Sequence, residues 1–137
     1  MTEVLSESQQ NKIHARLKEH DVRLLYLFGS AARGEMTKDS DYDLAVLTGK
    51  PFPPEDRFQC GLDLGVLLNR DVDLIDLREA SEPLKIQVIQ KGIPLYMASP
   101  HERAVFEMIA ISDYTRFNEE RRPAINRIRE SGRIYGQ

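Results

Sequence analysis

The sequence predicts an α/β (α+β) layer fold, a mixed β-sheet of about four strands flanked by helices and followed by a C-terminal helical tail. Three observations support this fold class. Helical and strand-like segments alternate along residues 1–97, the strand-like segments are short and rich in β-branched and aromatic residues, and Gly or Pro separates many of them. A length of 137 residues suits one domain.

The first helix is expected to begin after Ser6 and to end near His20. Ser6 and Gln9 have the spacing of a capping box, in which two side chains satisfy free amides of the first turn. Ile13 and Leu17 are four residues apart and therefore lie on one helix face.

Two strands with a short helix between them follow. The segment VRLLYLF, residues 22–28, predicts a buried strand that ends at Gly29, and SAARGEM, residues 30–36, predicts a short helix. The segment DYDLAVL, residues 41–47, alternates acidic with apolar residues and then becomes wholly apolar, which predicts a second strand.

The segment PFPPEDRF opens a third helix, because its prolines and acidic residues suit a first turn. Phe58, Leu62 and Val66 form one apolar stripe on this helix. Gly61 and Gly65 lower helix propensity but allow a neighbouring element to approach closely.

The remaining elements of the core are one helix and two strands. Residues 70–77, RDVDLIDL, predict a third strand, and residues 93–97, IPLYM, predict a final short strand. Between them a fourth helix is expected to begin after Ser81 and to end at Gly92.

Residues 98–137 are expected to form a C-terminal helical extension of the 1–97 core. Ser99, Pro100 and Glu102 repeat the pattern of a helix start, and Pro123 is expected to break or kink the helix. The apolar residues of the extension are Val105, Phe106, Met108 and Ile109, followed by Ile125 and Ile128 in a more weakly specified second stretch.

Composition excludes several classes of protein. The chain has 41% hydrophobic residues, 30% charged residues and a net charge of −3, which predict a folded globular domain. It has no apolar run long enough to span a bilayer and no signal-peptide pattern at its start, so a cytoplasmic location is expected. A single cysteine, Cys60, excludes an internal disulfide and is expected in the core.

The stretch LFGSAARGEMTKDSDYDLAV concentrates the chemistry-bearing residues. Gly29 and Gly34 have the spacing of a Walker phosphate loop, but Glu35 follows where the motif needs lysine. Asp39, Asp41 and Asp43 resemble the first half of an EF-hand loop. However, Leu44 replaces the required glycine, and Lys50 replaces the closing glutamate. Both motifs are excluded, while a plain solvent-exposed hairpin remains an alternative.

Asp41 and Asp43 predict a site for a divalent cation. Two residues apart on a strand, they share one face at roughly 6.6 Å along it. Their repulsion is removed by a bound cation, and Mg²⁺ prefers one or two carboxylates completed by water and phosphate oxygens. Two such ions about 3.5 to 4 Å apart would form the arrangement used in phosphoryl displacement.

A third carboxylate is expected from residues 70–77. Asp73 and Asp76 are three apart and face opposite sides of a strand, and Asp71 lies at the strand's edge. Asp73 is predicted to be the third carboxylate, because it is flanked by apolar residues and is expected to be buried. Burial of a lone carboxylate is costly unless a cation is bound to it.

Gly29 and Ser30 are expected to form an anion cradle. A tight turn after the strand begins a short helix whose free amides face the same edge as the acids. Ser30 either donates its hydroxyl to a terminal phosphate or caps the helix, and Arg33 either adds positive charge to the site or is a surface residue.

The spacing Gly29-Ser30, ten residues, then Asp41-Tyr42-Asp43 resembles the signature of the DNA polymerase β-type nucleotidyltransferase superfamily, with VDLI at 72–75 in the place of the third carboxylate. The small size and the closing GIPLYM strand resemble minimal nucleotidyltransferases, the MntA-type MNT antitoxins of HEPN-MNT modules. The resemblance covers roughly residues 10–97 and implies the minimal nucleotidyltransferase fold.

The resemblance implies a role for each matching residue. Asp41 and Asp43 would ligate two Mg²⁺ ions, Asp73 would complete the ion nearer the attacking hydroxyl, and Gly29 and Ser30 would hold the triphosphate of ATP. The implied reaction is attack of a hydroxyl on the α-phosphate, with pyrophosphate leaving.

The resemblance also implies a partner. Similar antitoxins of type VII-like modules transfer AMP to a tyrosine of a HEPN ribonuclease toxin, and residues 98–137, which hold seven arginines, would serve as a docking element. No membrane and no direct nucleic-acid binding are expected. Two alternatives stay open: an antitoxin that masks the toxin by contact alone, and a nucleotidyltransferase acting on a small molecule such as an aminoglycoside.

Overall fold

The computed structural model describes the backbone of residues 5–135 and the side chains of residues 5–120. Its four strands form one mixed sheet of order β3-β2-β1-β4, in which β1 runs antiparallel to β2 and β4, and β2 runs parallel to β3. The strands are β1 (Val22–Phe28), β2 (Tyr42–Thr48), β3 (Val72–Asp76) and β4 (Ile93–Met97). The expected mixed sheet is therefore confirmed.

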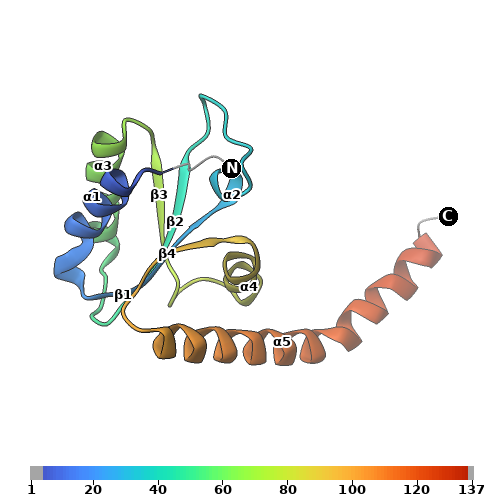
Figure 1. Cartoon of the computed structure of the whole chain (residues 1–137). Coiled ribbons are helices and arrows are strands. Elements are labelled where there is room, and N and C mark those ends of the chain that lie inside the picture. The colour runs from blue at the N-terminus through green and yellow to red at the C-terminus, as the bar shows by residue number, and fades with distance from the viewer. Residues whose placement is uncertain (1–4, 136–137) are drawn as a thin grey trace.

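Helices cover both faces of this sheet and extend beyond it (Figure 1). They are α1 (Glu7–Leu17) with the 3₁₀ turn η1 (Lys18–His20), α2 (Gly29–Ala32), α3 (Pro54–Leu68), α4 (Glu82–Lys91) and α5 (Pro100–Tyr135). The capping box of α1 is confirmed, because the Gln9 amide donates to Ser6 Oγ and the Ser6 amide donates to Gln9 Oε1.

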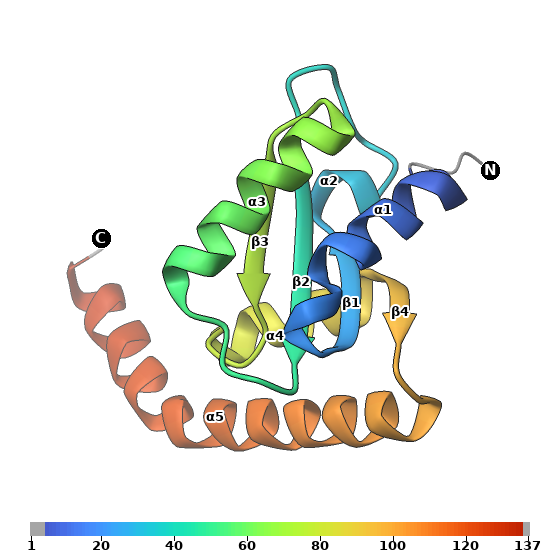
Figure 2. The same cartoon turned by 90° about the vertical axis from the view of Figure 1, so that its left-hand side faces the viewer.

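The two faces of the sheet carry separate hydrophobic clusters. Figure 2 shows α1 and α3 in front of the sheet and α4 behind it. Ile13 of α1 and Leu64 of α3 belong to the first cluster, and Val88 of α4 belongs to the second. The central strand β1 supplies both clusters, with Leu25 on one side and Tyr26 on the other, as a strand buried on both faces must.

The expected apolar stripe of α3 faces solvent and not the core. Phe58, Leu62 and Val66 are exposed, whereas the neighbouring stripe, which includes Cys60 and Leu64, is buried. The expectation that Cys60 is a core residue is confirmed. An i, i+4 pattern identifies a helix but does not say which of two apolar stripes the sheet will cover.

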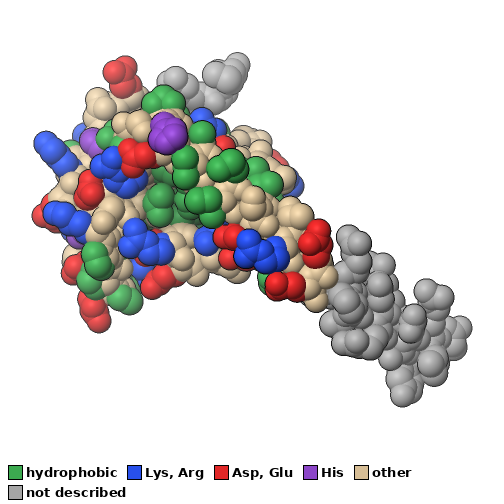
Figure 3. Space-filling view, turned by 90° about the horizontal axis from the view of Figure 1, so that it is seen from below, with side chains coloured by type: hydrophobic (Ala, Val, Ile, Leu, Met, Phe, Trp, Pro, Cys, Tyr) green, Lys and Arg blue, Asp and Glu red, His purple; other side chains and the backbone are tan. Residues whose placement is uncertain are grey.

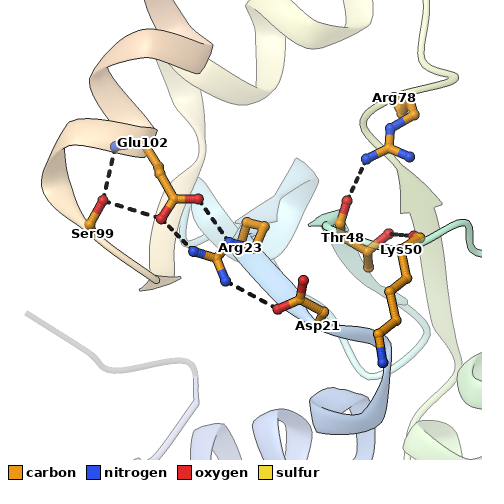
Figure 4. Close-up of polar contacts among 7 residues, drawn as sticks. All are labelled: Asp21, Arg23, Thr48, Lys50, Arg78, Ser99 and Glu102. Atoms are coloured by element: carbon orange, nitrogen blue, oxygen red, sulfur yellow. Dashed lines mark hydrogen bonds and ion pairs between the residues drawn. The ribbon is translucent and has the colours of Figure 1, made fainter.

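Helix α5 is anchored to β1 at its first turns (Figure 4). Ser99 caps it by accepting from the Glu102 amide at 3.1 Å, as expected. Arg23 on β1 donates to the Glu102 carboxylate through two nitrogens, and the buried Tyr26 donates its hydroxyl to Glu107 Oε2 at 2.7 Å. These contacts fix the direction in which α5 leaves the core.

Beyond its anchored turns α5 extends away from the body of the molecule. Of the two expectations for Pro123, a break is wrong, because the helix is continuous to Tyr135, and a kink agrees with the change of direction of the ribbon in its last third (Figure 1). The side chains of Ile125 and Ile128 lie outside the described residues. Within the part that the structure describes, no helix is long and apolar enough to cross a membrane.

Candidate active site

The candidate site lies at the end of the sheet where β1 ends and β2 and β3 begin. Asp43, the second residue of β2, is the Cα partner of Phe28 on β1 and of Asp73 on β3. Neighbouring strands lie about 4.8 Å apart, so the sheet places the Asp43 and Asp73 backbones side by side. The register therefore brings together the two strand positions that the sequence predicts for the site.

Gly29 closes the site from the β1 side. It has φ of +71°, and a Cβ built on it would overlap Oδ2 of Asp43 and lie 3.0 Å from its Cγ. Both the left-handed backbone and the position of the Asp43 carboxylate therefore require glycine here. Helix α2 begins at this residue, directly after β1.

Mutual repulsion of the acids shows in the ionisation of Asp43. Burial raises the pKa of this half-buried carboxyl group, the negative charges of Asp73 and Asp41 raise it further, and Arg33 lowers it. Like charges held together disfavour the charged form. The site is thus an anionic cluster with a basic side chain beside it.

Two details differ from expectation. Asp41 is exposed and directly precedes β2, which runs from 42 to 48 and not from 41 to 47. Asp73 is exposed, so the expectation of a buried carboxylate is wrong. The physical reason is the face of the sheet: Leu74 and Asp76 of the same edge strand are buried, and Leu74 packs in the cluster with α1 and α3, whereas Asp73 is on the opposite face, where it is not covered.

Ser30 and Arg33 lie on and beside α2. Ser30 is half-buried, but the residue that caps α2 is Phe28, so the alternative in which Ser30 caps the helix is wrong. Arg33 is exposed and donates to Glu35 Oε1 at 2.9 Å. Its positive charge lowers the pKa of Asp43.

The three aspartates fit Mg²⁺ by their chemistry. All their donors are carboxylate oxygens, which this ion prefers, and a cation would relieve the repulsion that raises the pKa of Asp43. Their side chains are not yet gathered around one point: among the described residues, no three His, Cys, Asp or Glu side chains form a ready metal-binding group. Joint ligation of one ion by all three would therefore require their side chains to move toward one another.

The other aspartates of the third strand are separate from this cluster. Asp76 is buried on the opposite side, as expected, where its Oδ1 accepts from the Arg78 amide and its Oδ2 lies 3.7 Å from Arg57. Asp71 precedes β3 and accepts from the Tyr42 amide through its carbonyl oxygen. Both have structural roles at the β3 strand.

Arg70 contributes to the candidate site by holding a neighbouring loop, although it was not predicted from the sequence. It donates to the carbonyl oxygens of Thr37 and Ser40 and lies 5.7 Å from the centre of the Tyr42 ring. It thereby fixes the loop that leads into Asp41. The contact joins residues about thirty positions apart, and no local pattern signals it.

Comparison with known proteins identifies the family. The sequence model of the family described as polymerase beta, nucleotidyltransferase matches residues 11–101, a span that contains every residue of the candidate site. The chain belongs to the polymerase β nucleotidyltransferase family. The expected fold and the superfamily resemblance are thereby confirmed.

Individual nucleotidyltransferases of known structure or function are also similar. The protein adenylyltransferase MntA of Shewanella oneidensis is 33% identical over 124 residues, which are 89% of this chain and 88% of MntA. A toxin-antitoxin crystal structure with AMP-PNP has a chain with 34% identity and a TM-score of 0.80, over 87% of this chain and 97% of its own.

A third similar structure contains a modified toxin. It holds a tri-AMPylated HEPN toxin of Shewanella oneidensis in complex with an MNT antitoxin. The matched chain has 31% identity and a TM-score of 0.75, and the match covers 89% of this chain and 97% of that one. These nucleotidyltransferases match nearly the whole chain and not only its catalytic core.

Proposed function

We propose that this nucleotidyltransferase is the antitoxin of a HEPN-MNT toxin-antitoxin pair and that it transfers AMP from ATP to a tyrosine of a HEPN ribonuclease toxin. The observation that carries the proposal is the paired placement of Asp43 and Asp73 beside the Gly29 turn. The similarity to MntA and to antitoxin chains seen with AMP-PNP and with an AMPylated toxin supports it.

Each site residue has a distinct role in the proposed reaction. Asp41, Asp43 and Asp73 would hold two Mg²⁺ ions, which supply Lewis-acid stabilisation of the phosphates and promote ionisation of the attacking hydroxyl. The backbone at Gly29 and the hydroxyl of Ser30 would bind the triphosphate, because the glycine lets a phosphate approach the main chain closely. Arg33 would add positive charge to the same end of the site.

The proposed transfer is a displacement at the α-phosphorus of ATP. The tyrosine oxygen forms a bond to the α-phosphorus of ATP, and the bond between that phosphorus and the bridging oxygen breaks. Pyrophosphate leaves with the electron pair, and the phenolic proton passes to solvent. A phenol has an ordinary pKa of about 10, so it needs far less activation than an aliphatic hydroxyl or water.

We propose that α5 contributes to binding of the toxin. The 98–137 extension would help to dock the toxin, because α5 extends beyond the core and exposes Met108, Ile109 and Ile111. Its first turns are part of the core's packing, since Phe106 contacts the second cluster and Ala110 is buried. Figure 3 shows a group of hydrophobic side chains bordered by charged ones on the face seen from below.

The test uses the chain, the HEPN protein of the same module, magnesium and ATP labelled at the α-phosphate. Label is expected on a toxin tyrosine, and Asp41→Asn combined with Asp43→Asn should abolish both labelling and neutralisation. Asp39→Asn is the control, because Asp39 is exposed in the preceding turn and outside the cluster. Full neutralisation by the double variant would contradict transfer and favour masking by contact.

A further inference from the structure

A groove runs between the outer side of α3 and the start of β3. Its volume is about 1010 Å³, and its lining includes Phe58, Leu62, Val66, Val72, Asp73 and Leu74. One wall is therefore helical and mostly apolar, with Arg57 also on it, and the other is the edge strand of the sheet, preceded by Arg70. Asp73, a residue of the candidate active site, lines the groove at this strand edge, while its side chain is on the face of the sheet opposite α3, because its neighbours Val72 and Leu74 pack on the α3 side.

The helical wall is an apolar ridge in contact with solvent. Phe58, Leu62 and Val66 follow one another every four residues along α3, and their exposed fractions are 69%, 51% and 82%. The opposite side of the helix already supplies the core through Leu64 and Leu68. Contiguous exposed apolar side chains of this kind mark surfaces that another molecule covers.

The arrangement of the site determines the side from which an acceptor arrives. Along the sheet, the Gly29 turn follows β1, Asp43 lies on β2 and Asp73 lies on β3. In phosphoryl transfer the attacking and leaving oxygens lie roughly in line. A triphosphate held at the Gly29 turn therefore places the attacking hydroxyl on the Asp73 side.

Beyond Asp73 the sheet ends. Among the described strands β3 is at the edge of the sheet, and the groove runs along this free edge. Apart from bonds of the sheet ladder, the described residues give no backbone hydrogen bond to Val72 or Leu74. A partner protein that brings an acceptor residue to Asp73 from beyond this edge therefore lies beside the groove.

We infer that the groove between α3 and β3 binds the acceptor-bearing segment of the toxin, with apolar side chains next to the acceptor tyrosine resting on Phe58, Leu62 and Val66. This inference rests on the proposed function and specifies its substrate side. The occupant is a segment of the partner protein and not a second copy of this chain, because the groove runs along the same edge strand that carries Asp73, the residue on the acceptor side of the site.

The experiment compares two lysine substitutions on one helix. Val66→Lys places a charge on the groove ridge, whereas Leu67→Lys changes the adjacent residue, which is 43% exposed and does not line the groove. The rate of AMP transfer is measured against toxin concentration for wild type and both variants. AMP-PNP binding and the thermal unfolding midpoint are measured alongside.

Val66→Lys is expected to raise the KM for toxin at least 10-fold, because a lysine cannot be buried unpaired against an apolar partner. Its kcat at saturating toxin and its AMP-PNP affinity should stay within about 2-fold of wild type, and Leu67→Lys should change the KM by less than 2-fold. An unchanged KM for Val66→Lys, or equal effects of both substitutions, would overturn the inference.

Two further outcomes separate this inference from others. If wild-type chain labels no toxin, the proposed function fails and the groove assignment fails with it; if wild type labels toxin while Val66→Lys does so at the same KM, only the groove assignment fails. Light scattering of the chain alone tests whether a second copy of this chain occupies the groove. A dimer that Val66→Lys converts to a monomer would assign the groove to self-association and overturn the inference.

Discussion

The Cα of Gly29 lies against the carboxylate of Asp43, so closely that a Cβ at position 29 would displace this carboxylate. The two residues are brought together by the β1–β2 pair, in which Phe28 and Asp43 are opposite each other. The turn proposed to bind phosphate and the carboxylate proposed to bind metal are therefore one packed unit. A change in either residue alters the position of the other.

Gly29→Ala should reduce AMP transfer by about 100-fold or more, because a displacement of about 1 Å at a reacting centre has an effect of that size. Gly34→Ala is a matched control: Gly34 also has φ of +71°, but nothing lies within 4 Å of its added Cβ. Both variants should lose about 1 to 2 kcal/mol of folding stability from the left-handed backbone. Equal activity of the two variants would contradict the contact with Asp43.

Asp43→Asn should raise the thermal unfolding midpoint at pH 7 in the absence of magnesium. Burial and the charges of Asp73 and Asp41 raise the pKa of Asp43 in the folded state, so its ionised form destabilises the fold above that raised pKa. As pH falls through the raised pKa toward the ordinary value near 4, wild type takes up its proton and the penalty disappears. The advantage of the variant over wild type should therefore narrow in acid.

Differential scanning measurements from pH 7 down to about pH 4 test this prediction. Asp39→Asn is the control, because Asp39 is exposed and its charge does not influence Asp43 in the way that Asp41 and Asp73 do. A gap that widens on acidification would mean that the ionised carboxylate stabilises the fold.

Magnesium should stabilise wild type but not Asp43→Asn. A ligand that binds only the folded state at ten times its Kd contributes about 1.4 kcal/mol, which should raise the unfolding midpoint by a few degrees. Calcium provides a comparison, because it is larger and takes six to eight oxygen ligands in a more flexible geometry than the octahedron of magnesium. A magnesium effect of the same size in the variant would place the ion elsewhere.

Tyr26→Phe should destabilise the chain by about 1.5 kcal/mol, the lower end of the range for a hydrogen bond to a charged group. The buried hydroxyl of Tyr26 donates to Glu107, whose carboxylate keeps a second donor in Arg103 at 2.8 Å. Tyr96→Phe, which keeps the ring contact with His14 at 4.4 Å, should change stability by less than about 0.5 kcal/mol.

Urea unfolding of both tyrosine variants measures this difference. Hydrogen exchange shows which part of the chain loses stability. Protection of the backbone amides should fall in the first turns of α5 for Tyr26→Phe and remain unchanged there for Tyr96→Phe. A uniform loss along the whole chain would show that Tyr26 does not specifically hold α5.

Local patterns in the sequence were sufficient to predict the elements of the fold. The strands at Val22–Phe28 and Ile93–Met97 have the predicted bounds, because each is a short apolar run between turn residues. The capping box of α1, the Ser99 cap of α5 and the Gly29 turn were equally local. Gly29, Asp41 and Asp43 also lie within one strand-turn-strand segment. The candidate site could therefore be predicted from the sequence.

Features that depend on which elements become neighbours were not predictable in this way. Asp73 was expected to be buried, but it is exposed because it is on the face of β3 opposite Leu74, and no residue pattern encodes how far the helices cover that face. The exposed stripe of Phe58 and Val66 likewise depends on which side of α3 meets the sheet. Arg70 acts on a loop that is distant along the chain.

The alternation of side chains along β1 has a thermodynamic consequence. Leu25 and Leu27 belong to the hydrophobic cluster under α1 and α3, while Leu24 and Tyr26 belong to the cluster under α4 and α5. Neither cluster can melt without releasing the strand that the other needs. Calorimetric and van't Hoff enthalpies of unfolding should therefore coincide, as for a single cooperative transition.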